Sequence, residues 1–197
     1  IRPRDWSSDV GSSDPPSQVK RFDRTVIALL ELSRLDAGAS ESMSDDVDLA
    51  DFIARVINRY GFTHVPLEVQ TTDGATTSGV VDRRRVERIL ANLLENARDH
   101  AGGATRVTLL STPTMFELAV EDDGPGIAVS ERERIFERFA RGSASRNSTG
   151  SGLGLAIVAE HARALGGEAR VENSARGGAR FVVTFTRHTS DDSEVSS

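Results

Sequence analysis

The chain has 197 residues, of which 38% are hydrophobic and 27% charged, and its formal net charge is −6. This composition fits one globular domain with an appendage and excludes a fibrous or disordered protein. The absence of cysteine excludes disulfides and thiolate metal sites, and an acidic chain without a basic patch has no electrostatic basis for binding nucleic acid. No apolar run approaches the roughly 20 residues of a membrane helix, so we expect a soluble domain.

The N-terminal residues 1–16 are rich in Ser, Asp and Pro and have no periodic pattern, so we expect them to be disordered. Residues 4–14 also match RDWSSDVCSSD, the translation of a common sequencing adapter, at every position except Gly11. We therefore interpret this segment as a sequencing artefact that stands in place of the native sequence. A natural linker is the alternative.

Residues 17–38 have the pattern of an amphipathic helix that ends at Gly38, in the manner of a C-cap glycine. The apolar side chains spaced three and four apart are Val19, Phe22, Val26, Leu29 and Leu30. A single helix cannot bury such a stripe, so the pattern predicts a partner helix.

The rest of the chain alternates irregularly between helical and strand-like segments. We predict helices over residues 49–60, 83–101, 131–136 and 152–165, and strands over residues 67–71, 106–111, 116–121, 168–173 and 179–186. Residues 41–48 are predicted to form an acidic loop and residues 188–197 a disordered tail. This order predicts a two-layer α/β sandwich over residues 46–187, with helices on one face of a mixed, mostly antiparallel sheet.

Two asparagines, Asn92 and Asn96, lie one helical turn apart, and His100 continues the same stripe. An amide oxygen is a hard, uncharged ligand that suits Mg²⁺. Asparagines in a helix are also common on a solvated surface, so this pair does not define a site alone.

A glycine turn follows the strand predicted at residues 116–121. An ionised Asp122 can accept a hydrogen bond from the exocyclic amine of adenine, while Gly124 and Gly126 allow the backbone to pass close to the base. An ordinary tight turn is the alternative.

A second glycine-rich segment, residues 150–155, opens an apolar helix. Backbone N–H groups at such a helix start can hold phosphate oxygens. Arg141 and Arg146 precede it and can either meet a triphosphate or remain solvated.

Residues 92–97, 122–127, 135–139 and 150–155 closely resemble, in order and spacing, the N, G1, F and G2 boxes of sensor histidine kinases. Residues 29–38 resemble the end of the second helix of that family's dimerisation hairpin. The resemblance implies the Bergerat-type ATP-binding fold, with ATP and Mg²⁺ bound. It also implies transfer of the ATP γ-phosphoryl group to a histidine, for relay to an aspartate of a response regulator.

The resemblance assigns a role to each matching residue. Asn96 would bind Mg²⁺, Asp122 would recognise adenine, and Asn92 and Arg138 would act on the phosphate side as catalytic residues. The other residues implied at the nucleotide are His100, Gly124, Gly126, Ile127, Phe136, Arg141, Gly150, Gly152, Leu153, Gly154 and Leu155. Phe136 and Phe139 would anchor the hinge of the lid in the core.

The chain departs from the family pattern at two points. Asp99 stands where the family often has a phosphate-binding lysine. A carboxylate repels phosphate, so phosphate binding would depend more on Arg138, Arg141 or Arg146. None of the four histidines is followed by Glu, as the acceptor box requires. We therefore expect a chain cut upstream of the acceptor histidine, which binds Mg·ATP without phosphorylating itself.

The implied partners are a dimerisation hairpin carrying the acceptor histidine, from the same or a partner subunit, and a cognate response regulator. The domain would be cytoplasmic, and its parent a homodimer anchored in the cell membrane. One alternative is an ATPase of the gyrase or chaperone type, which is disfavoured because Asn92 occupies the place of its catalytic Glu. The other is a nucleotide-binding interaction module without catalysis.

Overall fold

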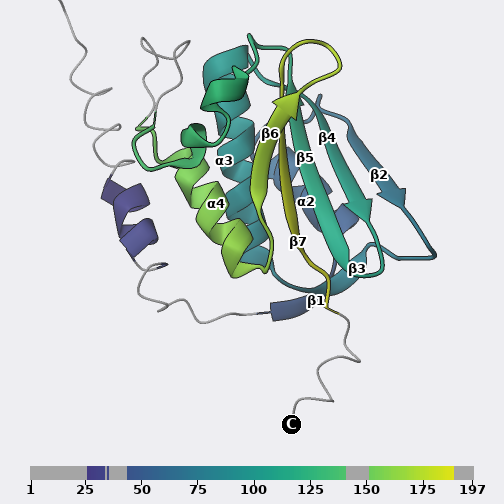
Figure 1. Cartoon of the computed structure of the whole chain (residues 1–197). Helices are drawn as coiled ribbons and strands as arrows, with labels where there is room; N and C mark the ends of the chain where they lie inside the picture. Colours follow the sequence, from purple (N-terminus) through teal and green to yellow (C-terminus); the bar gives the residue numbers. More distant parts are fainter. Residues whose placement is uncertain (1–25, 34, 36–43, 141–150, 189–197) are drawn as a thin grey trace, which may run out of the picture.

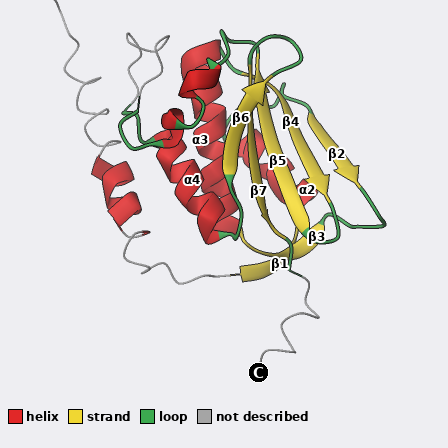
Figure 2. Cartoon of the chain, in the orientation of Figure 1, coloured by secondary structure: helices red, strands yellow, loops and turns green. Residues whose placement is uncertain are grey.

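A computed structural model describes residues 26–33, 35, 44–140 and 151–188 of the chain (Figure 1). Residues 1–25 and 189–197, which include the predicted disordered residues 1–16 and all of the predicted tail except His188, lie outside the described residues. The folded body has two layers, a twisted sheet and helices packed against one of its faces (Figure 2). This arrangement confirms the predicted two-layer sandwich.

The main sheet has five strands in the order β2-β4-β5-β7-β6. Their bounds are Leu67–Thr71 for β2, Ala104–Ser111 for β4, Met115–Asp122 for β5, Ala169–Asn173 for β6 and Ala179–Thr186 for β7. Only the edge strand β2 runs parallel to its neighbour, whereas the other three pairings of this sheet are antiparallel. The predicted mixed, mostly antiparallel sheet is therefore correct.

Three helices cover the inner face of the sheet: α2 (Leu49–Arg59), α3 (Arg83–Ala101) and α4 (Gly154–Ala164). The longest, α3, begins where Asp82 accepts hydrogen bonds from two backbone N–H groups of the first turn. It ends at Gly102, whose φ of 77° is left-handed. Its fully buried side chains, which face the sheet and α4, include Val86, Ile89, Leu90, Leu93 and Leu94.

The predicted acidic loop at residues 41–48 is wrong for its second half, because Ser44–Asp48 forms strand β1. β1 pairs antiparallel with β3 (Ser78–Asp82), a strand that was not predicted. Only Val47 of β1 is buried, so its acidic side chains stay in water while its backbone is paired. The first residue of the predicted tail, His188, also bridges to Val80 of β3.

The helix predicted at residues 131–136 is instead two 3₁₀ turns, η1 (Val129–Glu131) and η2 (Arg134–Phe136). The next helix, α4, begins at Gly154 rather than at Gly152, whose φ of 71° is incompatible with a right-handed helix.

Residues 26–33 and 35 are helical and lie beside the body, next to α4 (Figure 1). The predicted apolar stripe is exposed to solvent in these residues: Val26, Leu29 and Leu30 are 37%, 42% and 55% exposed. The Leu32 side chain instead faces the body and is only 1% exposed. None of the helices in the described ranges is both long enough and apolar enough to span a membrane.

Candidate functional site

The two asparagines predicted at the phosphate side lie on α3, and both are half-buried. The Asn92 amide donates a 2.8 Å hydrogen bond to the carbonyl oxygen of Arg88, one turn earlier. The Oδ1 atom of Asn92 faces α4, because a Cβ added to Gly154 would lie 3.1 Å from it. Gly154 therefore allows the start of α4 to approach Asn92 closely.

Asp122 is 4% exposed at the end of β5. Its Oδ1 atom accepts hydrogen bonds from the backbone N–H of Gly124, at 2.9 Å, and of Ala179, at 3.1 Å. A Cβ added to Gly178 would lie 1.9 Å from the carbonyl oxygen of Asp122, so only glycine fits there. The β6–β7 turn thus holds the carboxylate in place. Sequence reasoning missed this contribution, although the paired glycines 177 and 178 in the turn were its signal.

The glycine turn after Asp122 lies between the end of α3 and the β6–β7 turn. A Cβ on Gly124 would come within 2.8 Å of the Ala101 side chain, and one on Gly126 within 3.1 Å of the Gly177 carbonyl oxygen. Gly126 also has a left-handed φ of 69°. Ile127 then packs, partly buried, against the main core. The predicted adenine-side residues are therefore gathered in one place.

The F-box and G2-box segments meet at the two ends of residues 141–150, which lie outside the described residues together with Arg141 and Gly150. The Phe139 N–H donates a 2.9 Å hydrogen bond to the Gly152 carbonyl oxygen, and a Cβ on Gly152 would clash with the backbone of residues 139 and 140. Phe136 packs against the core as predicted. Phe139 does not, since it is 59% exposed with a left-handed φ of 63° that turns its ring outward.

The start of α4 has features of a phosphate site. Leu153 is the N-cap residue, and its apolar side chain makes no capping hydrogen bond to the first N–H groups of the helix. These groups and the positive end of the helix dipole favour an anion. Leu153 is fully buried and Leu155 packs partly buried against the core, which fixes this turn.

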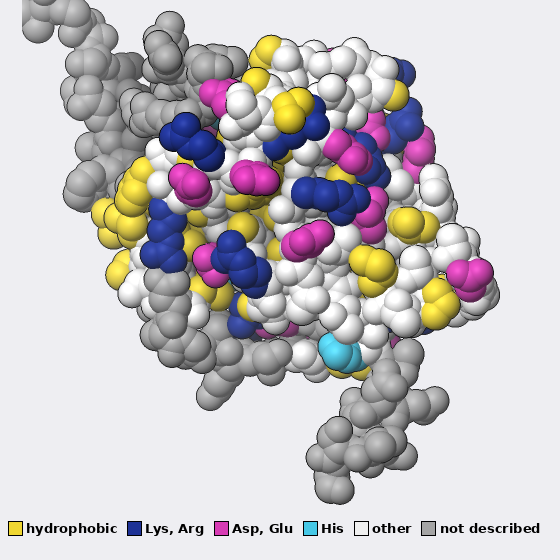
Figure 3. Space-filling model, in the orientation of Figure 1, with side chains coloured by type: hydrophobic (Ala, Val, Ile, Leu, Met, Phe, Trp, Pro, Cys, Tyr) yellow, Lys and Arg dark blue, Asp and Glu magenta, His cyan; other side chains and the backbone are white. Residues whose placement is uncertain are grey.

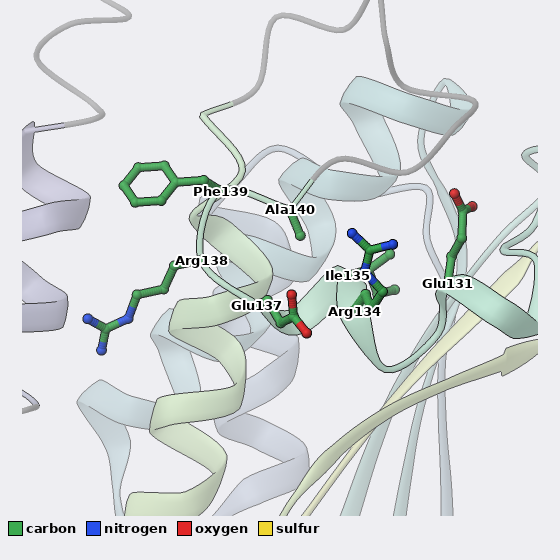
Figure 4. A pocket seen from close by; sticks show the side chains of 7 residues that line it. All are labelled: Glu131, Arg134, Ile135, Glu137, Arg138, Phe139 and Ala140. Atoms are coloured by element: carbon green, nitrogen blue, oxygen red, sulfur yellow. The ribbon is translucent and has the colours of Figure 1, made fainter.

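A cavity of about 220 Å³ lies beside the F box (Figure 4). The residues that line it are Glu131, Arg134, Ile135, Glu137, Arg138, Phe139 and Ala140. Arg138 and Phe139 extend to one side of this segment, away from Arg134 and Ile135. Arg138 is the only one of the predicted site residues in this lining, so the cavity does not define the adenine or Mg²⁺ position.

His100 and Asp99 occupy the last turn of α3 and are exposed. Asn92, Gly152, Leu153 and Gly154 lie around the start of α4, whereas Asp122, Gly124 and Gly126 lie at the end of α3. The structure thus brings two groups of candidate residues to α3, one around Asn92 and one at its C-terminal end, whereas Arg138, in the F box, lies apart from both.

Residues 81–189 match the model of the histidine kinase-, DNA gyrase B- and HSP90-like ATPase family. The chain belongs to this family. It resembles AfsQ2 of Streptomyces coelicolor, a signal transduction histidine-protein kinase, with 39% identity over 176 residues that cover 88% of this chain and 32% of AfsQ2. The chain spans about a third of the length of the curated relatives it matches.

Solved structures share the same fold. The ATP-binding domain of PrrB from Mycobacterium tuberculosis is 31% identical, with a TM-score of 0.54 over 74% of this chain and 98% of that one. Full-length ShkA in complex with AMPPNP is 26% identical, with a TM-score of 0.64 over 84% of this chain and 36% of that one. The predicted relationship to sensor histidine kinases is therefore confirmed.

Proposed function

We propose that this chain is the ATP-binding catalytic domain of a sensor histidine kinase, which transfers the γ-phosphoryl group of ATP to a protein histidine. The observation that carries the proposal is the buried Asp122 carboxylate. Both backbone donors to it use Oδ1. Its Oδ2 atom is thereby available to accept a hydrogen bond from the exocyclic amine of adenine, beside the turn that Gly124 and Gly126 keep narrow.

The residues present fit a nucleotide. A Cβ on Gly152 would clash with the backbone of residues 139 and 140, and one on Gly154 would press on Asn92 Oδ1. The N-cap residue Leu153 offers no side-chain hydrogen bond, which leaves the backbone N–H groups of this turn suited to phosphate oxygens. Asn96, half-buried one turn after Asn92, would hold Mg²⁺ through its amide oxygen. The cation would neutralise charge on the phosphates during transfer.

The reaction forms a bond between an imidazole nitrogen and the γ-phosphorus while the bond from phosphorus to the bridging oxygen breaks, and ADP leaves with that electron pair. The protein contributes position and charge. Arg138 would stabilise the transferring phosphoryl group, and Asn92 would support the phosphate side. Because the Asn92 amide cannot take a proton from water, it favours transfer to a protein nucleophile over ATP hydrolysis.

The same proposal gives the partners: a hairpin bearing the acceptor histidine and a response regulator whose aspartate receives the phosphoryl group. The exposed apolar face of residues 26–33, with Val26, Ile27 and Leu30, supports a helical partner and a homodimer. Figure 3 shows hydrophobic side chains gathered on the side of the molecule where Figure 1 places this helix. We place the domain on the cytoplasmic side of a membrane-anchored parent.

The test is to incubate the chain with Mg²⁺, γ-labelled ATP and a separately produced acceptor hairpin. We expect label in the hairpin as phosphohistidine, which is labile to acid and stable to base, and none with the Asn96→Ala variant. Release of free phosphate without labelled hairpin would favour the ATPase alternative. Nucleotide binding without either product would favour an interaction module, and absence of binding would overturn the proposal.

A further inference from the structure

A partly buried carboxylate attaches residues 26–33 to the body. Glu31 pairs with Arg88 of α3 through two hydrogen bonds, one of them 2.8 Å from Nε to Oε1. The Nε2 atom of His161, on α4, lies 3.0 Å from the same Oε1 atom. Burial alone would raise the pKa of Glu31, but the hydrogen bonds from His161 and Arg88 and the charge of Arg88 lower it to about 2. The carboxylate is therefore charged and accepts hydrogen bonds from both partners.

His161 contributes to this contact as a donor. It is 5% exposed, and its Nδ1 atom is buried without a hydrogen-bond partner. A proton on Nδ1 would be a buried, unsatisfied donor, so the tautomer that fits donates from Nε2 to Glu31.

An apolar contact lies next to this polar one. Leu32 is 1% exposed and forms a small cluster with Leu153 and Ile157 of the α4 region, which is separate from the main core. Leu153 belongs to the G2 box and is the N-cap residue of α4. The docked helix therefore packs directly on the segment that begins the predicted phosphate site.

Both contacts lead to the predicted nucleotide site. The carbonyl oxygen of Arg88 receives the Asn92 amide, and Gly154, next to Leu153, approaches Asn92 Oδ1. The helix thus contacts α3 through Arg88 and α4 through His161, and both of these helices carry residues of the predicted site.

We infer that Glu31 and Leu32 are positioning residues for the nucleotide site. The docked helix holds Leu153 and the first turn of α4 against Asn92, so docking strengthens nucleotide binding. By linkage, nucleotide binding strengthens docking to the same degree. This inference rests on the proposed nucleotide-binding function.

The contact is suited to switching because it is small. Among the described residues of this segment, Glu31 and Leu32 anchor the helix, with Ala28 packed beside Leu32, while Val26, Ile27 and Leu30 remain exposed. An element with few buried contacts opens at a low free-energy cost. A partner that binds the exposed face more tightly in one state of the helix than in the other would change docking and, through docking, the affinity for nucleotide.

The experiment measures docking and nucleotide binding in the same protein. Since the chain has no cysteine, spin labels can be placed only at introduced residues, Ile27→Cys and Val129→Cys, whose native side chains are 57% and 76% exposed. The distance between the labels reports docking, and calorimetry with Mg·AMPPNP reports affinity. We expect Glu31→Ala and Leu32→Ala to broaden the distance distribution and to raise the nucleotide Kd about fivefold or more. Saturating nucleotide should narrow the distribution again.

The matched control is Glu160→Ala, which removes the exposed ion pair with Arg163 on α4 and should leave both measurements unchanged. A released helix with an unchanged Kd would overturn the coupling, and a helix that stays docked in Glu31→Ala and Leu32→Ala would overturn the anchoring role. If the parent chain bound no nucleotide, the proposed function and the coupling would both fail, while the label distance would still show whether Glu31 anchors the helix.

Discussion

The backbone N–H of Ala179, at the start of β7, donates a 3.1 Å hydrogen bond to Oδ1 of Asp122, at the end of β5. The Gly124 N–H uses the same oxygen at 2.9 Å. A carboxylate that is 4% exposed must find such donors, because burial without them is costly. Asp122 therefore has a structural function in joining two turns, in addition to the proposed recognition of adenine, and substitutions there must separate the two.

The variant Asp122→Asn separates them. Asparagine keeps one oxygen for the two backbone donors but replaces the second oxygen with an amide NH₂ group. This group only donates, so it cannot accept a hydrogen bond from the exocyclic amine of adenine. We expect little change in thermal stability and a loss of ATP affinity of about tenfold or more. Guanine has a carbonyl where adenine has its amine, so the GTP-to-ATP affinity ratio should rise. Calorimetry with both nucleotides checks this, and an unchanged ATP affinity would contradict the assignment.

The paired glycines of the β6–β7 turn provide a second prediction. An added Cβ would lie 1.9 Å from the Asp122 carbonyl oxygen at Gly178, whereas it would meet nothing within 4 Å at Gly177, whose φ is 98°. We expect Gly178→Ala to destabilise the fold by about 3 kcal/mol through overpacking. Gly177→Ala should cost only the backbone strain, about 1 kcal/mol. Urea unfolding measures both, and equal effects would show that the close contact to Asp122 does not govern the turn.

Elements with strong local signals were predicted well. The helix predicted over residues 83–101 is α3, because Asp82 caps it, apolar residues recur along one face and Gly102 ends it. The last strand, residues 179–186, also matches, since a glycine turn and an apolar run define it.

Elements that depend on distant partners were not predicted. Strand β1 reads SDDVD, in which only Val47 is buried, and it is a strand because β3 pairs with it. In β3, a Cβ on Gly79 would lie 2.9 Å from the Phe116 ring, a contact across the fold that the sequence does not reveal. Short polar strands of this kind have no periodic signal of their own.

For the candidate site, the motif order named residues that lie near α3, such as Asn92, Gly124 and Gly154, but it did not show how they are held. The β6–β7 turn fixes Asp122 through a hydrogen bond from Ala179. The two residues are 57 positions apart, so no local sequence pattern reveals this contact. The resemblance to the F box implied that Phe139 anchors the hinge of the lid in the core, yet its left-handed backbone turns its side chain outward. The pairing of Glu31 with Arg88 and His161 joins segments far apart in the sequence, so no local pattern predicts it.

A third prediction concerns the metal. Asn96→Ala removes the amide oxygen proposed to bind Mg²⁺ and should abolish the Mg²⁺-dependent part of ATP binding, while the weaker binding in EDTA should remain. Asn58→Ala, at an exposed position of α2, is the matched control and should change neither value. Titrations with and without Mg²⁺ decide the point. Equal loss with and without Mg²⁺ would instead indicate a role for Asn96 in folding or in direct contact with the nucleotide.

The last prediction is the pH dependence of the Glu31 contact. The pKa of Glu31 is lowered from 4.5 to about 2. A carboxyl group whose pKa is lower in the folded state stabilises that state fully above its ordinary pKa, and this stabilisation is lost as the pH falls toward and through the folded value. The stabilisation by Glu31 should therefore be constant above about pH 5 and decline between about pH 4.5 and pH 2.

Glu31→Gln tests this without changing the shape of the side chain. The substituted amide would carry no charge at any pH, so the parent chain should have the higher free energy of unfolding at pH 6, and the difference should shrink steadily at pH 4 and pH 3. Urea unfolding of both proteins at each pH measures the difference, and comparison with Glu160→Gln, in a surface ion pair of α4, corrects for general acid effects. A difference that stayed constant down to pH 3 would mean that Glu31 does not hold the helix through its charge.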